Sequence, residues 1–298
     1  MRGIDTHIKE VLDDTAHRIE QSPELNCAVI AYVGPIHPQI IDTYISKIEQ
    51  VRHRIDQQPD HPNPRRLAIV LTTGGGVVEV VEKMVQVTRR HFDEVFFIVP
   101  MQAMSAGTIW CMSGDKIFMD YTSSLGPIDP QVQNPEGQFV PALGYIDKVN
   151  EIIEKPQGTI SDAEAMMINR LDLATLRRYE QARDLSITLL QEWLVQYKFK
   201  DWTHHRTHNQ GAAVTQEEKV ERASQIAKDL SNNNIWHSHG RMISIDTLRC
   251  KLHLEIEDYT DHTVLREHLK SYAGLLVEYI NNTNQAFIVH STTAGATS

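Results

Sequence analysis

The sequence predicts an α/β protein built on a largely parallel sheet. Between residues 26 and 119, short apolar runs rich in β-forming residues alternate with stretches of helical spacing. Two of these runs, residues 67–71 and 95–99, each end in small residues that lead into a helical pattern. Strands that alternate with helices form right-handed βαβ units, which produce a parallel sheet. Helical patterns dominate the later part of the chain, so we expect a long C-terminal helical region.

The elements of the first part follow from hydrophobic periodicity and from turn-forming residues. Apolar residues recur at helical spacing in 5–21, 37–57 and 77–91, and a short helix is expected after Ser105. Apolar runs predict strands at 26–33, 67–71, 94–99 and 116–119. The segment 57–66 contains three prolines and is expected to be a loop.

The later part of the chain begins with an irregular segment. Residues 123–145 are rich in proline, glycine and serine, and a loop of this length is commonly functional. Residues 161–164 (SDAE) form a capping-box pattern that predicts the start of one long helix, 162–198. Further helices are expected at 145–154, 217–230 and 263–281, and the small, polar residues 282–298 predict a flexible tail.

The composition restricts the class of protein. The net charge is −10 and no concentrated basic patch is visible, so we expect no nucleic-acid partner. Three cysteines, Cys27, Cys111 and Cys250, lie in apolar contexts, which is typical of reduced core residues in a cytosolic protein. No uncharged apolar run approaches about 18 residues, and the polar start is unlike a signal peptide. We therefore expect a cytoplasmic protein without a membrane span.

Ser105 is the first candidate for chemistry, because it stands among small residues at the entrance to a helix. A serine hydroxyl becomes a nucleophile when a base removes its proton, and helix N-terminal amides stabilise the oxyanion that develops. Simple helix capping explains the serine equally well on local sequence alone. The chain lacks the G-x-S-x-G pattern, which argues against an α/β-hydrolase.

The glycine triplet Gly74–Gly76 follows the strand that neighbours the one leading to Ser105. Glycine backbone can approach a substrate closely and point its amides at a carbonyl oxygen, although a tight turn is the simpler explanation. A nucleotide-binding loop is excluded because neither G-x-G-x-x-G nor a glycine loop ending in Gly-Lys-Ser/Thr is present. Parallel strands end at one edge of a sheet, so the triplet and Ser105 together predict a hydrolase with an oxyanion site beside a nucleophile.

The general base stays open between histidines and lysines. No histidine occurs between His91 and His204. A histidine base would therefore be distant in sequence, the candidates being His204, His205, His208, His237 and His239. The lysines that follow the serine are Lys116, Lys148 and Lys155. A lysine in an apolar setting loses its charge more readily and can act as a general base, whereas most lysines are solvated surface residues.

Two other groups of residues have simpler explanations that we favour. Asp129 lies in a Gly-Pro-Ile-Asp-Pro-Gln segment and would either orient a partner or cap a turn, of which the turn is favoured. The histidine-rich segment 203–208 and the pair His237 and His239 suggest a metal site, but no carboxylate accompanies them as in H-E-x-x-H. We expect no metal and no cofactor.

The candidate residues lie in segments that resemble the Clp/crotonase superfamily. The matching segments are LAIVLTTGGG (67–76), VPMQAMSAGTIWCMSGDKIFM (99–119), SSLGPIDPQ (123–131), PALGYIDKV (141–149) and WHSHGRMISIDTLRCKLHLEIED (236–258). Within its serine-peptidase branch, the chain is most similar to the serine dehydrogenase proteinase family, a relative of signal peptide peptidase A and of the proteolytic subunit of Clp protease. The resemblance covers residues 26–258.

The resemblance implies roles for individual residues. Ser105 would be the nucleophile, and the oxyanion amides would come from Gly75 or Gly76 and from Ala106. Clp-type relatives carry a histidine base in the region that here reads LGPIDPQ, and this chain has none there. The Ser-Lys version known in membrane-associated relatives would place the base at Lys148.

The resemblance also implies the architecture and the activity. It implies a crotonase-like fold of stacked βαβ turns, assembled as ring-shaped homo-oligomers (trimers or hexamers), and a serine peptidase that hydrolyses a peptide or unfolded-protein substrate. The expected division is an N-terminal helix (1–25), the peptidase domain (26–258), a C-terminal helix (259–281) and the tail (282–298). A catalytically silent, ring-forming scaffold is the first alternative. A crotonase-type acyl-CoA enzyme is the second, although residues 104–106 offer none of the carboxylates it would need.

Overall fold

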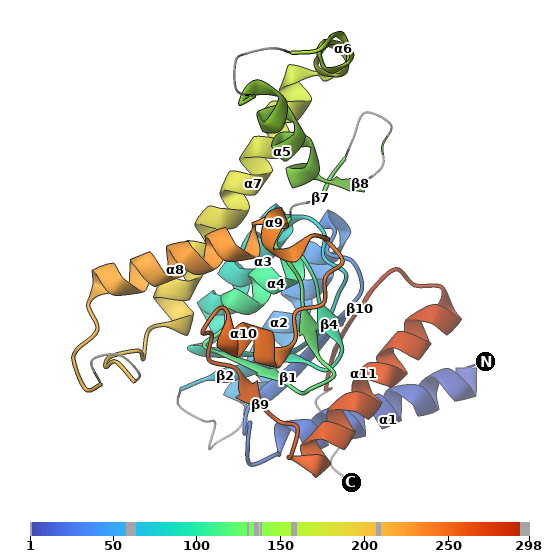
Figure 1. Cartoon of the computed structure of the whole chain (residues 1–298). Helices are drawn as coiled ribbons and strands as arrows, with labels where there is room; N and C mark the ends of the chain where they lie inside the picture. Colours follow the sequence, from blue (N-terminus) through green and yellow to red (C-terminus); the bar gives the residue numbers. More distant parts are fainter. Residues whose placement is uncertain are drawn as a thin grey trace.

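The computed structural model of the chain describes residues 2–57, 64–129, 131–133, 137, 139–155, 160–206 and 210–292. Its centre is a six-stranded sheet in the order β10-β1-β2-β3-β5-β9 (Figure 1). Five strands run parallel: β1 (Ala28–Val33), β2 (Arg66–Thr72), β3 (Glu94–Val99), β5 (Lys116–Met119) and β9 (Glu257–Asp258). The predicted α/β class with a largely parallel sheet is confirmed.

Helices cover both faces of this sheet. On one face, α2 (Ile41–Asp56), α3 (Val78–His91) and α4 (Ala106–Met112) enclose the larger core, and α1 (Arg2–Glu20) and α11 (Thr263–Thr283) enclose the smaller core on the other face. Alternate strand residues serve the two cores, as Ile69 and Val70 of β2 illustrate. Figure 1 shows α1 and α11 side by side, away from the other helices.

Trp110 of α4 organises the larger core. Its indole ring is fully buried and meets the rings of Tyr32, Tyr44 and Phe97 edge-on, at centroid distances of 5.5, 5.6 and 5.7 Å. Such edge-to-face contacts add to the free energy that burial alone contributes. The short helix α4, which begins directly after Ser105, is therefore held firmly against β1, β3 and α2.

The later elements form an arm and a cover. The helices α5 (Ala142–Ile153), α6 (Asp162–Asn169) and α7 (Leu173–Trp193) extend away from the sheet in Figure 1. A π-helical turn (Leu194–Lys198) then leads toward α8 (Gln216–Leu230), and α9 (Asn233–Trp236) and α10 (Ile245–Cys250) follow it. The remaining short elements are the 3-10 turn η1 (Pro38–Ile40) and two strand pairs: β4 (Gln102–Ala103) with β6 (Ser124–Leu125), and β7 (Gln131–Gln133) with β8 (Phe139–Pro141).

Four local expectations are wrong. The helix predicted over 162–198 is interrupted before α7, where the Asp172 side chain caps a new helix by accepting from the Thr175 amide at 2.9 Å. Residues 288–291 of the expected flexible tail form β10 (Ile288–Ser291), antiparallel to β1. The irregular segment 123–145 contains β6 and the paired strands β7 and β8. Cys250 is exposed, whereas Cys27 and Cys111 are buried as expected.

Candidate active site

Ser105 occupies a strained position between β4 and α4. Its backbone has φ 51° and ψ −116°, a conformation that residues other than glycine rarely adopt. The residue is 1% exposed, and its Oγ donates a hydrogen bond to the main-chain oxygen of Asp129 at 2.9 Å. The side chain makes no capping bond to α4. Helix capping, the simpler explanation of this serine, is therefore not its role in this structure.

The glycine triplet lies directly against Ser105. Gly75 has φ 102°, and a Cβ atom there would lie 2.8 Å from the Met104 oxygen and 2.9 Å from the Ser105 Cβ. Only glycine allows this approach. Two backbone hydrogen bonds hold the two loops together, Thr73 N to Gln102 O at 2.9 Å and Met104 N to Thr73 O at 3.0 Å. The carboxyl ends of neighbouring strands thus bring the glycines and the serine together.

The three amides suggested for the oxyanion site differ in their present bonding. The Gly75 amide already donates to the Thr73 hydroxyl at 3.0 Å. The Gly76 amide and the Ala106 amide, at the start of α4, donate to no acceptor within the part of the chain that the structure describes. Backbone amides that have no acceptor can donate hydrogen bonds to a substrate oxygen on which negative charge develops. Gly76 and Ala106 are therefore better placed for this task than Gly75.

Asp129 is the titratable group nearest to Ser105 in the network of contacts. Its carboxylate is 2% exposed and accepts a hydrogen bond from the Leu143 amide of α5 at 3.0 Å. Burial and, to a smaller extent, the charge of Asp147 raise the pKa of Asp129, the amides of Leu143 and Ala142 lower it, and together these influences bring the pKa to about 6. The side chain lies 3.8 Å from the Nδ1 atom of His239.

Lys148 does not reach Ser105 in this conformation. It lies on α5, where Ile146 and Val149 face the interior, and its own side chain is 55% exposed. Its Nζ lies 3.0 Å from the Glu151 carboxylate. The other two candidate lysines bind acidic partners as well: Lys155 pairs with Glu164, and Lys116 with Glu257.

Among the candidate histidines that the structure describes, only His239 approaches Asp129, the residue whose main-chain oxygen binds Ser105. Its segment is aligned with the segment preceding Asp129 by two hydrogen bonds between Leu125 and Ile243, of 3.1 and 2.8 Å. Burial lowers the pKa of His239. His204 contacts Thr203, His205 contacts Glu218, His237 is exposed, and His208 lies outside the described residues. The sequence names His239 but offers no signal that separates it from the other four.

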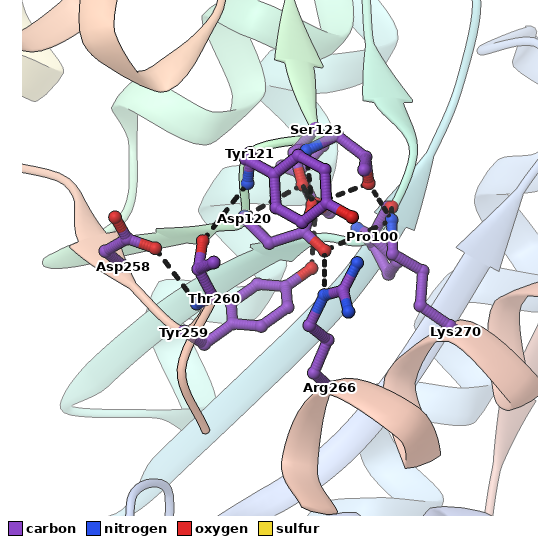
Figure 2. A network of polar contacts seen from close by, with 11 residues as sticks. Pro100, Asp120, Tyr121, Ser123, Asp258, Tyr259, Thr260, Arg266 and Lys270 are labelled. Atoms are coloured by element: carbon purple, nitrogen blue, oxygen red, sulfur yellow. Dashed lines mark hydrogen bonds and ion pairs between the residues drawn. The ribbon is translucent and has the colours of Figure 1, made fainter. Parts of the chain in front are cut away.

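A second polar network stabilises the chain on either side of the nucleophile (Figure 2). Asp120, at the end of β5, is fully buried and accepts hydrogen bonds from Arg266 at 2.8 Å and from Ser123 at 3.0 Å. Lys270 binds the Pro100 carbonyl and also approaches Asp120 at 3.4 Å. Because Pro100 follows β3 and Ser123 precedes β6, the network fastens α11 to both loops that frame Ser105. Local sequence patterns do not reveal this network, because Asp120 and Arg266 are 146 positions apart along the chain.

A comparison of the sequence with known protein families agrees with the observed fold. A model described as the ClpP-like SDH-type serine proteinase matches residues 28–210. The chain belongs to this family. The match confirms the family that the sequence resembles, and it covers the glycine triplet, Ser105 and Lys148.

Two curated relatives of this chain come from one organism. One uncharacterized protein of Methanocaldococcus jannaschii is 36% identical over 83 residues, which cover 28% of this chain and 29% of the relative. A second uncharacterized protein of the same organism is 24% identical over 152 residues, 48% of each chain. The chain thus spans less than half the length of the curated relatives it matches.

Solved structures with a similar arrangement include two variants of the 1510-N membrane-bound stomatin-specific protease. A serine-to-alanine variant has a TM-score of 0.44 at 12% identity, covering 80% of this chain and 81% of the other. A lysine-to-alanine variant in complex with a substrate peptide has a TM-score of 0.42 at 14% identity, covering 78% and 73%. Among the described residues of this ClpP-like proteinase, no helix is sufficiently long and apolar to cross a bilayer.

We predict that Gly75→Ala lowers the free energy of unfolding by about 2 kcal/mol, because a Cβ at positive φ would press on Met104 and Ser105. Urea denaturation measures the change. Gly74→Ala is the matched control, since a Cβ at Gly74 meets nothing within 4 Å, and it should stay within about 0.5 kcal/mol of the parent chain. Equal stability of the two variants would contradict the close approach.

We predict that Asp120→Asn destabilises the protein by about 3 kcal/mol at neutral pH, because it leaves two cations beside a buried site without their counter-charge. Burial alone would raise the pKa of Asp120, but hydrogen bonds from Thr122, Arg266 and Ser123 outweigh it and lower the pKa to about 2. A lowered pKa contributes stability that is present above about pH 4 and is lost as the pH falls toward 2.

Urea denaturation at several pH values measures this effect. The gap between Asp120→Asn and the parent chain should narrow as the pH falls from about 4 to 2. Asp258→Asn is the control, because it removes a more exposed pair with Arg249 and should cost less than about 1 kcal/mol. A gap that does not change with pH would show that the Asp120 charge is unimportant.

Proposed function

We propose that the chain is a serine peptidase in which Ser105 is the nucleophile. The observation that carries the proposal is the contact of the glycine loop with the strained serine at the start of α4. A backbone so placed holds the hydroxyl in one position, beside amides that can donate hydrogen bonds to a substrate oxygen. This arrangement is what attack on a carbonyl group requires.

The proposed reaction has two steps. The Ser105 Oγ bonds to the carbonyl carbon of the scissile peptide while its proton passes to the Lys148 amine, and the amides of Gly76 and Ala106 bind the oxyanion. The C–N bond then breaks, and the departing amine takes the proton, leaving an acyl-enzyme. Water gives a proton to Lys148 and attacks the acyl carbon. The bond from this carbon to the Ser105 Oγ then breaks, Lys148 returns the proton to the Oγ, and the second product leaves as a carboxylic acid.

The structure corresponds in this proposal to a resting state. The Ser105 hydroxyl is engaged by Asp129 and the Lys148 amine by Glu151, so α5 must approach Ser105 before the dyad forms. A cavity of about 390 Å³ lies against α5, where Leu143 and Asp147 line part of it, and neither Ser105 nor the glycine triplet belongs to its lining. Assembly into a homo-oligomer, as a trimer or hexamer, is the proposed event that moves the arm. A cytoplasmic location belongs to the same proposal.

Neither alternative function is favoured by an observation of this structure. An acyl-CoA enzyme of crotonase type would need carboxylates where residues 104–106 place Met, Ser and Ala. A silent scaffold does not require the strained backbone at Ser105, whose conformation costs free energy of about 1–3 kcal/mol.

We predict that a fluorophosphonate probe adds one adduct to the assembled protein. Intact-mass analysis should find the adduct absent from Ser105→Ala, and labelling of Lys148→Met should be slower by about 100-fold, because the proton of the serine then has no base. Lys155→Met is the control lysine, which should label at the parent rate. Labelling of Lys148→Met at the parent rate would exclude the dyad, and no labelling of a folded oligomer would favour the scaffold.

A further inference from the structure

Asp129 connects the nucleophile with the helix that bears Lys148. Its main-chain oxygen accepts the Ser105 hydroxyl at 2.9 Å, and its carboxylate accepts the Leu143 amide at 3.0 Å. Leu143 is the second residue of α5, and Lys148 lies further along the same helix. A single residue thus holds the serine with its backbone and the start of α5 with its side chain.

The loop that carries Asp129 is firmly anchored. Thr108 of α4 hydrogen-bonds to both the carbonyl and the amide of Gly126, at 2.9 and 3.0 Å. The Ile128 amide donates to the Leu230 carbonyl at the end of α8, at 3.0 Å. Because the loop is tied to α4 and α8, the arm helix α5 is the more easily displaced partner of the Asp129 carboxylate.

The packing of α5 supports this view. Two of its residues, Ala142 and Ile146, belong to a small apolar cluster with Tyr179 of α7, separate from the two cores of the sheet. The end of α7 is packed in the larger core through Leu189, Leu190 and Trp193, whereas α5 contributes residues only to this small cluster, which offers little resistance to a local displacement of α5. A hydrogen bond from a buried carboxylate to the first turn of α5 is correspondingly important.

The charged groups around Asp129 come from four elements. The Asp147 carboxylate of α5 and the His239 imidazole face it directly. Arg183 of α7, which pairs with Asp184 at 2.9 Å, and Lys228 of α8 line the cavity shared with Asp147. The N-terminal amides of α5 favour a carboxylate over a neutral acid at this place.

We propose that Asp129 is a positioning residue for the serine–lysine dyad: as a carboxylate it holds the start of α5 at the loop that orients Ser105, and its protonation loosens this hold. The inference rests on the proposed function only for its effect on rate, because the attachment of α5 is a structural claim that holds for an inactive protein as well.

The direction of the pH dependence follows from the buried position of Asp129. Its pKa of about 6 means that the carboxylate forms, and the cap on α5 strengthens, as the pH rises through 6. Ser105 labelling should therefore increase across this range. The native state keeps the Asp129 proton up to about pH 6, whereas the unfolded chain loses it near pH 4. The free energy of unfolding therefore falls as the pH rises from about 4 to 6, and this penalty remains at higher pH. Asp129→Asn lacks that penalty, keeps an oxygen for the Leu143 amide, and is expected to fold.

The first experiment measures the rate of fluorophosphonate labelling from pH 5 to 8. The labelling rate of the parent protein should rise with pH along a limb that has an apparent pKa near 6. Asp129→Asn should lack this limb and should label about tenfold more slowly than the parent at pH 7.5. Asp147→Asn should shift the limb to lower pH, because removal of a neighbouring negative charge favours the carboxylate. Glu154→Gln, which removes an exposed carboxylate directly after α5, should leave the limb unchanged.

A second experiment is independent of catalysis. Hydrogen exchange of peptides from α5, corrected for the intrinsic effect of pH, should show protection that increases through pH 6 in the parent protein and remains low in Asp129→Ala. Exchange of peptides from β1 to β3 controls for folding. An intact limb in Asp129→Asn, or α5 protection that is the same in Asp129→Ala and the parent, would overturn the inference. Absent labelling would contradict the proposed function alone, while the exchange result still decides the role of Asp129.

Discussion

The candidate site depends on a contact between two backbones, that of Gly75 and that of Ser105. The two loops can lie together because Gly75 has no Cβ to separate them, and the short β4 segment pairs with Thr73 to keep them in register. Strand pairing at the centre of the sheet establishes this register, since β2 and β3 are neighbours and end at the same edge. The amides around Ser105 are thus positioned by the most rigid part of the molecule.

A strained serine backbone persists only where the surrounding structure compensates for it. Two sets of interactions supply the compensation. Trp110 holds α4 from within the larger core, and the Asp120 network attaches the flanking loops to α11 on the other face of the sheet. The C-terminal helix α11 therefore supports the site from a distance. Its Lys270 binds the carbonyl of Pro100, which precedes Ser105 by only a few residues.

The proposed base is supported differently. Lys148 lies on an arm with a small apolar cluster of its own, and its helix is attached near Ser105 through Asp129. A rigid nucleophile and a displaceable base would suit the proposed control by assembly, in which the dyad forms only when the arm is in place. The contact between the strained serine and the glycine loop is already present without this movement of the arm. In the proposed mechanism, the oxyanion site is therefore formed in advance, and only the activation of the hydroxyl depends on the arm.

The sequence alone determined four parallel strands of the sheet (β1, β2, β3 and β5), the helices that flank them, and the pairing of the glycine triplet with Ser105. These features follow from local apolar periodicity and from the rule that parallel strands end at one edge, so no distant contact was needed to predict them. The break before α7 was harder to predict from the sequence. An aspartate such as Asp172 is common on helix surfaces, and only the structure shows that its side chain caps a new helix. Strand β10 lies in a polar tail and owes its order to its partner β1.

Only the tertiary structure decided how the site is completed. It showed that the Gly75 amide is already bonded, that the Lys148 amine is paired with Glu151, and that His239 approaches Asp129, alone among the candidate histidines that the structure describes. It also joined Asp120 to α11 across the sheet. These relations are between residues far apart in the chain, and their geometry depends on how whole elements pack. Local sequence patterns carry no record of that packing, whereas they record strand and helix periodicity directly.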